Sequence, residues 1–191
     1  MAKQLAKFQR QNFWEDDTIY FLTDSTFIHY PYFSKDEQKE IILDQLRNIK
    51  QKFNIKISDF SIAINHYHVK FYLENGLDML KIKQQLRGGI SYQYRKRYQV
   101  PYKEMWQSRR IIPVVSEEVN WKISGYIAGN LLKHKEVGTF EKLKNNRFSS
   151  YSFMVGKYGE NEINSLIRGV IDVNEDGFGN VDIEKLSEIK F

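Results

Sequence analysis

The 191-residue chain contains no cysteine, so disulfide bonds and zinc–thiolate sites are excluded and a reducing cytosol is the expected environment. The opening segment, residues 1–7, is followed by no apolar stretch typical of a secretion signal. No run of 18 apolar residues occurs anywhere in the sequence. These absences predict a soluble, cytoplasmic protein that is neither exported nor anchored in a membrane.

The composition predicts one folded domain, because 41% of the residues are hydrophobic and 15% are aromatic. The net charge of +5 conceals an asymmetry along the chain. Residues 160–191 contain eight acidic side chains and three basic ones, so the preceding residues carry a net charge of +10. We therefore expect a basic functional domain over residues 1–158 and an acidic C-terminal extension over residues 159–191.

Two histidines separated by one residue are the first candidate for a site. In the segment Asn65-His66-Tyr67-His68 the period of two places both imidazoles on one face of a strand, while Tyr67 faces the core. Two ring nitrogens on one face can converge on a single cation. A His-x-His pair occurs often by chance, so the neighbouring elements decide whether it binds metal.

A predicted helix over residues 116–135 supplies such a neighbour. Apolar residues recur at positions 119, 123, 127 and 131, and Ser116 is placed to cap the first turn. Tyr126 and Asn130 are four residues apart and therefore share one face of this helix.

Four segments occur in an order that resembles the HUH single-tyrosine transposases, and the chain is most similar to the REP-associated tyrosine transposases and their insertion-sequence relatives. The segments are Asn65-His66-Tyr67-His68, Trp106-Gln107-Ser108-Arg109, Tyr126-Ile127-Ala128-Gly129-Asn130 and Phe148-Ser149-Ser150-Tyr151. Three positions depart from the family pattern: Ile64 and Leu131 replace prolines, and Phe148 replaces a tryptophan. None of these departures removes a reacting group.

The resemblance implies an enzyme of DNA transposition and recombination. A divalent cation, Mg²⁺ or Mn²⁺, would be held by His66, His68 and Asn130, while Tyr126 attacks a scissile phosphate of single-stranded DNA near a hairpin. The enzyme becomes joined to a 5′ end and needs no nucleotide cofactor. Glutamines supply alternatives to Asn130 as the third ligand: Gln93, Gln99 and Gln107. The partner DNA sequence, the metal, and the choice between a monomer and a dimer stay open.

Residues 79–116 are rich in the residue types that bind DNA. They contain nine lysines and arginines against one acid, with tyrosines and a tryptophan interleaved. The alternative interpretation is a buried stripe of Leu86, Ile90 and Tyr94 beside a solvated basic face. We favour DNA contact and predict the following binding residues: Arg87, Arg95, Lys96, Arg97, Trp106, Gln107, Arg109 and Lys122.

The order of predicted elements indicates an α+β fold of the ferredoxin-like or RRM-like kind, with an antiparallel sheet and helices packed on one face. Strands are expected at residues 18–23, 55–64, 66–74 and 109–115, with Pro113 favouring an edge position. Helices are expected at residues 34–53, opened by a Ser34–Glu37 capping box, at 77–98, with a kink or a DNA approach at Gly88-Gly89, at 116–135 and at 182–189. The rest of the C-terminal extension is expected to be rich in turns.

Several features have simpler interpretations. His29 and His134 stand alone and are expected to be surface or helix-end residues. The segment Asp172–Gly177 resembles the start of a calcium loop, but the glutamate required at its twelfth position comes one residue late, at Glu184. Two other functions stay open: a domesticated DNA-binding protein that no longer transposes, and an RRM-like RNA-binding module whose exposed sheet face would carry His66, His68, Lys70 and Tyr72.

Overall fold

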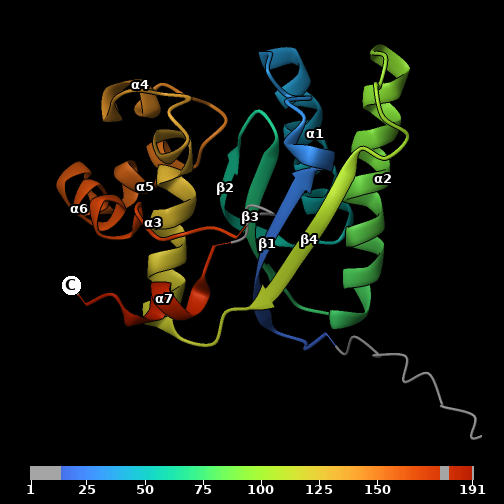
Figure 1. Cartoon of the computed structure of the whole chain (residues 1–191). Helices are drawn as coiled ribbons and strands as arrows, with labels where there is room; N and C mark the ends of the chain where they lie inside the picture. Colours follow the sequence, from blue (N-terminus) through green and yellow to red (C-terminus); the bar gives the residue numbers. More distant parts are fainter. Residues whose placement is uncertain (1–13, 177–180, 191) are drawn as a thin grey trace, which may run out of the picture.

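A computed structural model describes residues 14–176 and 181–190, and in this part of the chain four strands form one antiparallel sheet (Figure 1). The strand order is β2-β3-β1-β4. The strands are β1 (Thr18–Thr26), β2 (Lys56–Ile62), β3 (His66–Leu73) and β4 (Trp106–Pro113). The side chains of Ser108 and Arg109 lie outside the described residues. Strand β4 lies at an edge of the sheet, as Pro113 predicted.

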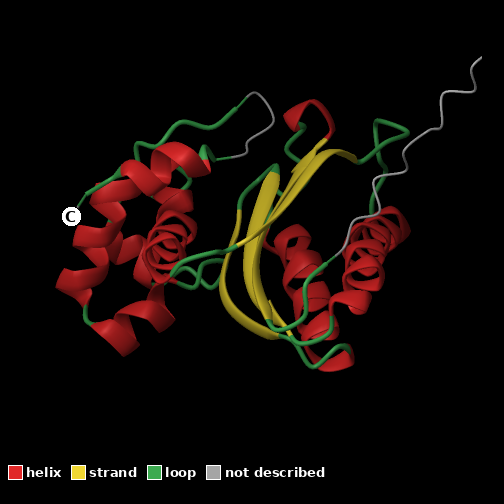
Figure 2. Cartoon of the chain, turned by 90° about the horizontal axis from the view of Figure 1, so that it is seen from below, coloured by secondary structure: helices red, strands yellow, loops and turns green. Residues whose placement is uncertain are grey.

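Two helices, α1 (Asp36–Lys52) and α2 (Met79–Arg97), pack on one face of the sheet (Figures 1 and 2). The alternation of β3 sends Tyr67, Val69 and Phe71 into the core between these helices and the sheet, where all three are fully buried. The cap of α1 lies one residue later than predicted: the side chain of Gln38 accepts a hydrogen bond from the Lys35 N–H, so Lys35 replaces Ser34 as the cap.

The opposite face of the sheet is covered by α3 (Glu117–Lys133) and the helices that follow it (Figure 2). These are α4 (Phe140–Lys144), α5 (Tyr151–Tyr158), α6 (Glu160–Val170) and α7 (Ile183–Glu188), and single 3₁₀ turns occur at Phe27–His29 and Gly76–Asp78. The predicted antiparallel α+β fold is confirmed. The expected exposed sheet face is wrong, because His66, His68 and Lys70 are 3%, 0% and 2% exposed beneath α3.

Two local predictions also change. Helix α2 runs without interruption through Gly88-Gly89, and a side chain at Gly89 would stand 2.7 Å from Gln45 of α1. Gly89 therefore permits close helix packing and the predicted kink is wrong, whereas Gly88 faces open space and the DNA approach there stays a prediction. The C-terminal extension contains α6 in addition to α7, because Ile163, Leu166 and Ile167 pack their apolar stripe on the core.

A buried ion pair fixes α3 on the sheet. The Lys70 ammonium lies 2.9 Å from the Asp59 carboxylate, and their side chains are 3% and 5% exposed. Lys70 also donates to the Asn120 side chain at 2.6 Å and to the hydroxyl of Ser124, both on α3. Burying two charges is costly unless they are paired and hydrogen-bonded, and these contacts meet that condition. The helix that carries Tyr126 is thus tied to the strands that carry the histidines.

Candidate active site

Strand β3 places His66 and His68 side by side, with ring centroids 5.0 Å apart. Each ring uses its Nδ1 atom for a hydrogen bond: His68 with the Thr23 hydroxyl at 2.9 Å, and His66 with the Asn65 side-chain oxygen at 2.8 Å. The amide oxygens beside His66, that of Asn65 at Nδ1 and that of Asn130 at Nε2, can only accept, so a neutral ring donates to one of them and meets the other with a lone pair. Both rings are therefore oriented as metal ligands usually are.

The third predicted ligand lies beside them. The side-chain oxygen of Asn130 is 3.1 Å from Nε2 of His66, so two lone-pair atoms face each other when the His66 proton is on Nδ1, toward Asn65. The buried Nε2 of His68 has no hydrogen-bond partner among the described residues. A cation bound by these three atoms would satisfy all of them. No three His, Cys, Asp or Glu side chains of the described chain form a metal cluster, so Asn130 is the candidate for a third protein ligand.

Burial keeps both imidazoles neutral. Desolvation, followed by the neighbouring His134, lowers the pKa of His66 to about 3. Desolvation, followed by His66, lowers the pKa of His68 well below its ordinary value of 6.5. Neutral rings bind a cation without first having to lose a proton.

The stability of the metal-free protein should therefore fall as the pH drops below 6.5. Unfolded histidines take up protons there, whereas folded His66 stays neutral down to about pH 3. The free energy of unfolding should decrease by about 1.4 kcal/mol per pH unit for each histidine. Urea titrations at pH 7, 6 and 5 measure it. The His66→Gln variant should show a shallower slope, and equal stability at all three pH values would contradict the prediction.

Tyr126 lies against the histidine pair. Its ring centroid is 5.3 Å from that of His68, and its side chain is 1% exposed. The hydroxyl donates a hydrogen bond to the carboxylate of Glu175. Burial, and then the charge of Glu175, raises the pKa of Tyr126 well above 10, so the phenol is neutral in this arrangement.

Two residues of the site were not predicted from the sequence. His134 is a helix-end residue as predicted, the C-terminal cap of α3, but it does not stand alone, because its ring centroid is 4.7 Å from that of His66. The sequence spacing could have indicated that His134 belongs to the site, because Tyr126, Asn130 and His134 recur every four residues on one helix face. Glu175 comes from the segment after α6, and nothing in the local sequence points to it.

The predicted DNA-binding residues do not form one surface. Arg95, Lys96 and Arg97 are exposed in the last turn of α2, beside the buried stripe of Leu86, Ile90 and Tyr94. These three basic residues remain candidates for contact with DNA.

Trp106 and Lys122 are buried inside the protein, and Arg87 is paired but 30% exposed, so its contact with DNA stays a prediction. The Trp106 ring is in the core and its Nε1–H donates to the Ser91 hydroxyl at 2.9 Å, so it has no face for a base. Lys122 is fully buried and bonded to Glu118 at 2.6 Å. Arg87 lies 2.6 Å from the buried Asp24 carboxylate. The side chain of Arg109, another predicted contact, lies outside the described residues.

The glutamine alternatives for the third ligand lie elsewhere. Gln93 belongs to α2, on the far face of the sheet from α3 (Figure 1). Gln99 follows the end of the same helix and is exposed. Gln107 accepts a hydrogen bond from the Ile28 N–H at 3.0 Å, and its amide nitrogen lies 3.1 Å from the His29 ring. Asn130 is therefore the amide that the fold brings to the histidines.

The departures from the family pattern have local explanations. The Ile64 N–H, which a proline would lack, donates to Glu136 at 2.8 Å and fixes the turn before His66. Leu131 is fully buried and continues α3, and Phe148 is also buried. The Phe148 carbonyl accepts from the Ile62 N–H at 2.9 Å, so this segment extends the β2 edge.

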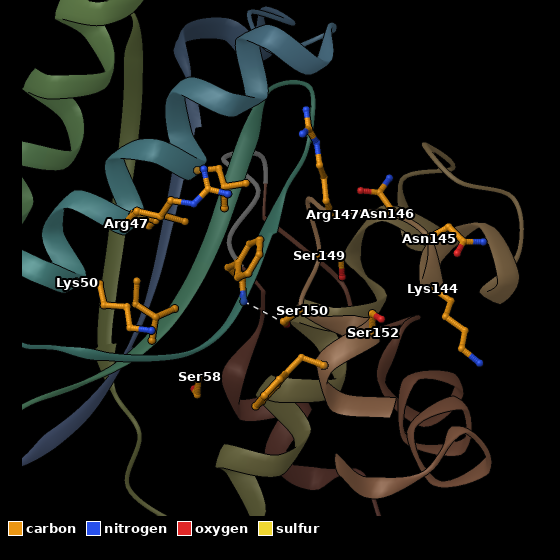
Figure 3. Close-up of a pocket in the computed structure, with 15 residues that line it drawn as sticks. Arg47, Lys50, Ser58, Lys144, Asn145, Asn146, Arg147, Ser149, Ser150 and Ser152 are labelled. Atoms are coloured by element: carbon orange, nitrogen blue, oxygen red, sulfur yellow. Dashed lines mark hydrogen bonds between the residues drawn. The ribbon is translucent and has the colours of Figure 1, made fainter. Parts of the chain in front are cut away.

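A groove of about 690 Å³ lies away from the histidines, between α1 and the α4–α5 region (Figure 3). The Ser150 hydroxyl accepts from the Phe60 N–H at 3.2 Å along its wall. Arg47 and Arg147 both lie at this groove, and both pair with Glu40. None of the residues predicted to bind metal or DNA, and not the predicted nucleophile, lines it.

The fold is that of a tyrosine transposase. The solved structure of a REP-associated tyrosine transposase bound to a REP hairpin is similar with a TM-score of 0.65 and 15% sequence identity, over 95% of this chain and 99% of that chain. A family model described as "Transposase IS200 like" matches residues 26–130, more than half of the sequence. The chain belongs to this family of IS200-like transposases.

A second solved structure, a candidate transposase from Deinococcus radiodurans R1, is similar with a TM-score of 0.46 and 17% identity, over 66% of this chain and 95% of that chain. No curated protein sequence matches. Within the described residues, no helix is long and apolar enough to cross a membrane.

Proposed function

We propose that this transposase cleaves and rejoins single-stranded DNA at hairpin sites through a covalent 5′-phosphotyrosine on Tyr126. The observation that carries the proposal is the contact of the Tyr126 ring with His68, beside Nε2 of His66 and the side-chain oxygen of Asn130. The candidate nucleophile lies on α3 and the two histidines lie on β3, and Lys70 of β3 ties these elements together through Asn120 and Ser124 of α3. The similar solved structure, a REP-associated tyrosine transposase bound to a REP hairpin, supports the choice of substrate.

The residues suggest how the reaction proceeds. His66, His68 and Asn130 would hold Mg²⁺ or Mn²⁺, which when bound supplies charge stabilisation at a scissile phosphate. The Tyr126 oxygen forms a bond to phosphorus as the bond to the 3′-oxygen breaks, and the phenolic proton ends on the departing 3′-hydroxyl or on water. Because the leaving 3′-hydroxyl can attack the phosphotyrosine in return, joining is the reverse of cleavage.

The exposed end of α2 is the proposed DNA surface. Arg95, Lys96 and Arg97 are exposed there, and Tyr92, one turn earlier, is 63% exposed and available for base stacking. Changing the three basic residues to glutamine should weaken hairpin binding and reduce the slope of log Kd against log salt by up to about 0.7–0.9 for each lost phosphate contact. Fluorescence anisotropy at salt concentrations between roughly 50 and 300 mM measures this slope.

The matched control changes three exposed lysines on the other side of the sheet, Lys142, Lys144 and Lys157, to glutamine. It removes the same net charge, so a purely long-range charge effect would weaken binding equally. Equal losses in the two triple variants would refute a specific contact at the end of α2.

Incubation with labelled single-stranded hairpins from the flanks of its own gene, with Mn²⁺ or Mg²⁺, tests the proposed function. A protein–DNA adduct that survives a denaturing gel and requires the metal is the expected result. Tight binding without an adduct, with both metals and several hairpins, would favour the domesticated DNA-binding protein. The RNA-binding alternative loses its basis, because α3 covers the face that carries His66 and His68.

We further propose that residues 1–158 form the transposase unit and act in the cytoplasm, with residues 159–191 as an extension packed on α3. The absence of cysteine supports a reducing compartment. A Cβ atom on Gly125 of α3 would stand 2.5 Å from Leu166 of α6, which shows how closely the extension packs. The Lys70 contacts hold α3 on its own sheet, which favours action of Tyr126 within one subunit.

A further inference from the structure

Three groups on α3 converge on one carboxylate oxygen beside the candidate nucleophile. Oε1 of Glu175 accepts the hydrogen bond from the Tyr126 hydroxyl and lies 3.3 Å from Nε2 of His134 and 3.6 Å from Nζ of Lys133. The Glu175 side chain is only 12% exposed. An anionic oxygen is thus held by three groups that can donate hydrogen bonds, in a nearly dry position.

We propose that this oxygen occupies the position that a non-bridging oxygen of the scissile phosphate takes in the reaction, and that His134 and Lys133 are phosphate-binding residues. The proposal rests on the proposed function of Tyr126 and adds two residues to it. A carboxylate and a phosphodiester present the same kind of acceptor, an anionic oxygen that prefers charged or polar donors. A phosphate oxygen in hydrogen-bond reach of the Tyr126 hydroxyl also places phosphorus near the atom that must attack it.

The position of Lys133 and His134 in the fold supports an anion site formed by side-chain donors. Lys133 and His134 lie at the C-terminal end of α3, where the helix dipole disfavours an anion. An anion can therefore be held there only by side-chain donors, and two of them are present. The same end of α3 carries Asn130, so a phosphate held by His134 would lie beside the proposed metal ligands.

Lys133 is placed to bind an anion that takes the position of the Glu175 carboxylate. Its ammonium donates to the carbonyl of Ile171 at 2.9 Å and to the carbonyl of Val173, both in the segment that leads to Glu175. It also lies 5.3 Å from the centre of the Tyr126 ring. When this segment gives way to DNA, Lys133 loses its acceptors together, and the arriving phosphate is the anion within its reach.

His134 has two alternative roles, as a fourth metal ligand or as a purely structural cap. Its Nε2 faces the Glu175 carboxylate, and no metal-binding cluster of His, Cys, Asp and Glu forms among the described residues. A structural cap would contribute to stability without any affinity for an anion. The three roles therefore differ in what the protein binds when metal is absent.

The test uses the full chain, free of metal, with inorganic phosphate as the probe. In wild-type protein the Glu175 carboxylate excludes phosphate, whereas Glu175→Gln removes the charge and keeps the size of the side chain. We expect phosphate to bind the Glu175→Gln and Glu175→Ala variants at least tenfold more tightly than wild type. Calorimetry and the ¹⁵N shift of the His134 ring report the binding.

Adding His134→Ala or Lys133→Met to Glu175→Gln should weaken phosphate binding at least fivefold, and the Glu184→Ala control should behave as wild type. Equal phosphate affinity with and without His134 and Lys133, or no phosphate binding by either Glu175 variant, would overturn the proposal. Because this titration involves neither metal nor cleavage, its outcome is separate from that of the hairpin reaction.

A second readout uses the hairpin substrate under single-turnover conditions with Mn²⁺. The His134→Gln variant should slow adduct formation at least tenfold while the hairpin Kd changes less than twofold. A change in Kd alone would show that His134 only assists binding of the DNA as a whole.

Discussion

The Tyr126→Phe variant should form no covalent adduct with a hairpin substrate and should cleave it more slowly by a factor of about 10⁴ or more, because the attacking oxygen is missing. Hairpin affinity should change less than about twofold, since the tyrosine is 1% exposed and lies apart from the proposed DNA surface at the end of α2. Denaturing gels measure the adduct and anisotropy measures the affinity. Loss of adduct with retained binding assigns Tyr126 to the chemical step.

Tyr151→Phe is the matched control for this experiment. Tyr151 is also buried, and its hydroxyl bonds to Asn164 at 2.6 Å on the helices behind α3. Removing the Tyr151 hydroxyl breaks a comparable buried hydrogen bond but leaves the histidine pair unchanged. Adduct formation should therefore remain within about twofold of wild type. An adduct that persists in Tyr126→Phe would show that another residue is the nucleophile.

The Asp59→Ala variant should lose about 3–5 kcal/mol of its free energy of unfolding, the largest stability effect we expect from one substitution. It leaves the Lys70 ammonium charged, 3% exposed and without its counter-ion. The Lys70→Met/Asp59→Leu double variant should recover most of that stability, because no buried charge remains. Urea titration measures all three proteins.

The control for Asp59→Ala is Asp44→Ala, which removes a surface pair with Arg47 whose side chains are 59% and 55% exposed. Surface pairs are worth at most about 1 kcal/mol, so this variant should be close to wild type. If Asp59→Ala costs no more than the surface variant, the buried pair does not anchor α3. Asp59→Ala should also slow adduct formation. It removes the partner of Lys70, which donates to the hydroxyl of Ser124, and Ser124 lies two residues before Tyr126 on α3.

The strongest local patterns were sufficient to predict most of the architecture. The period of two around His66 and His68 correctly placed both imidazoles on one face of β3, and the spacing of Tyr126 and Asn130 placed them together on α3. Pro113 correctly marked an edge strand. These predictions depend on neighbours within a few residues, which a sequence displays directly.

The features that depend on distant parts of the chain were missed. Glu175 reaches Tyr126 from 49 positions away, and α3 covers a sheet face that the strand pattern alone left exposed. Trp106 was predicted to contact DNA because basic residues surround it in sequence, whereas β4 directs its ring into the core. Periodicity identifies the two faces of an element and does not identify what packs against each.

The most direct test of the central claim is to digest the Mn²⁺-dependent hairpin adduct with protease and nuclease and to locate the modified residue by mass spectrometry. We expect a nucleotide joined through its 5′-phosphate to Tyr126, in the peptide that also contains Asn130. A nucleotide attached to any other residue would contradict the assignment of the nucleophile. So would the absence of a modified peptide in a sample that has cleaved its hairpin.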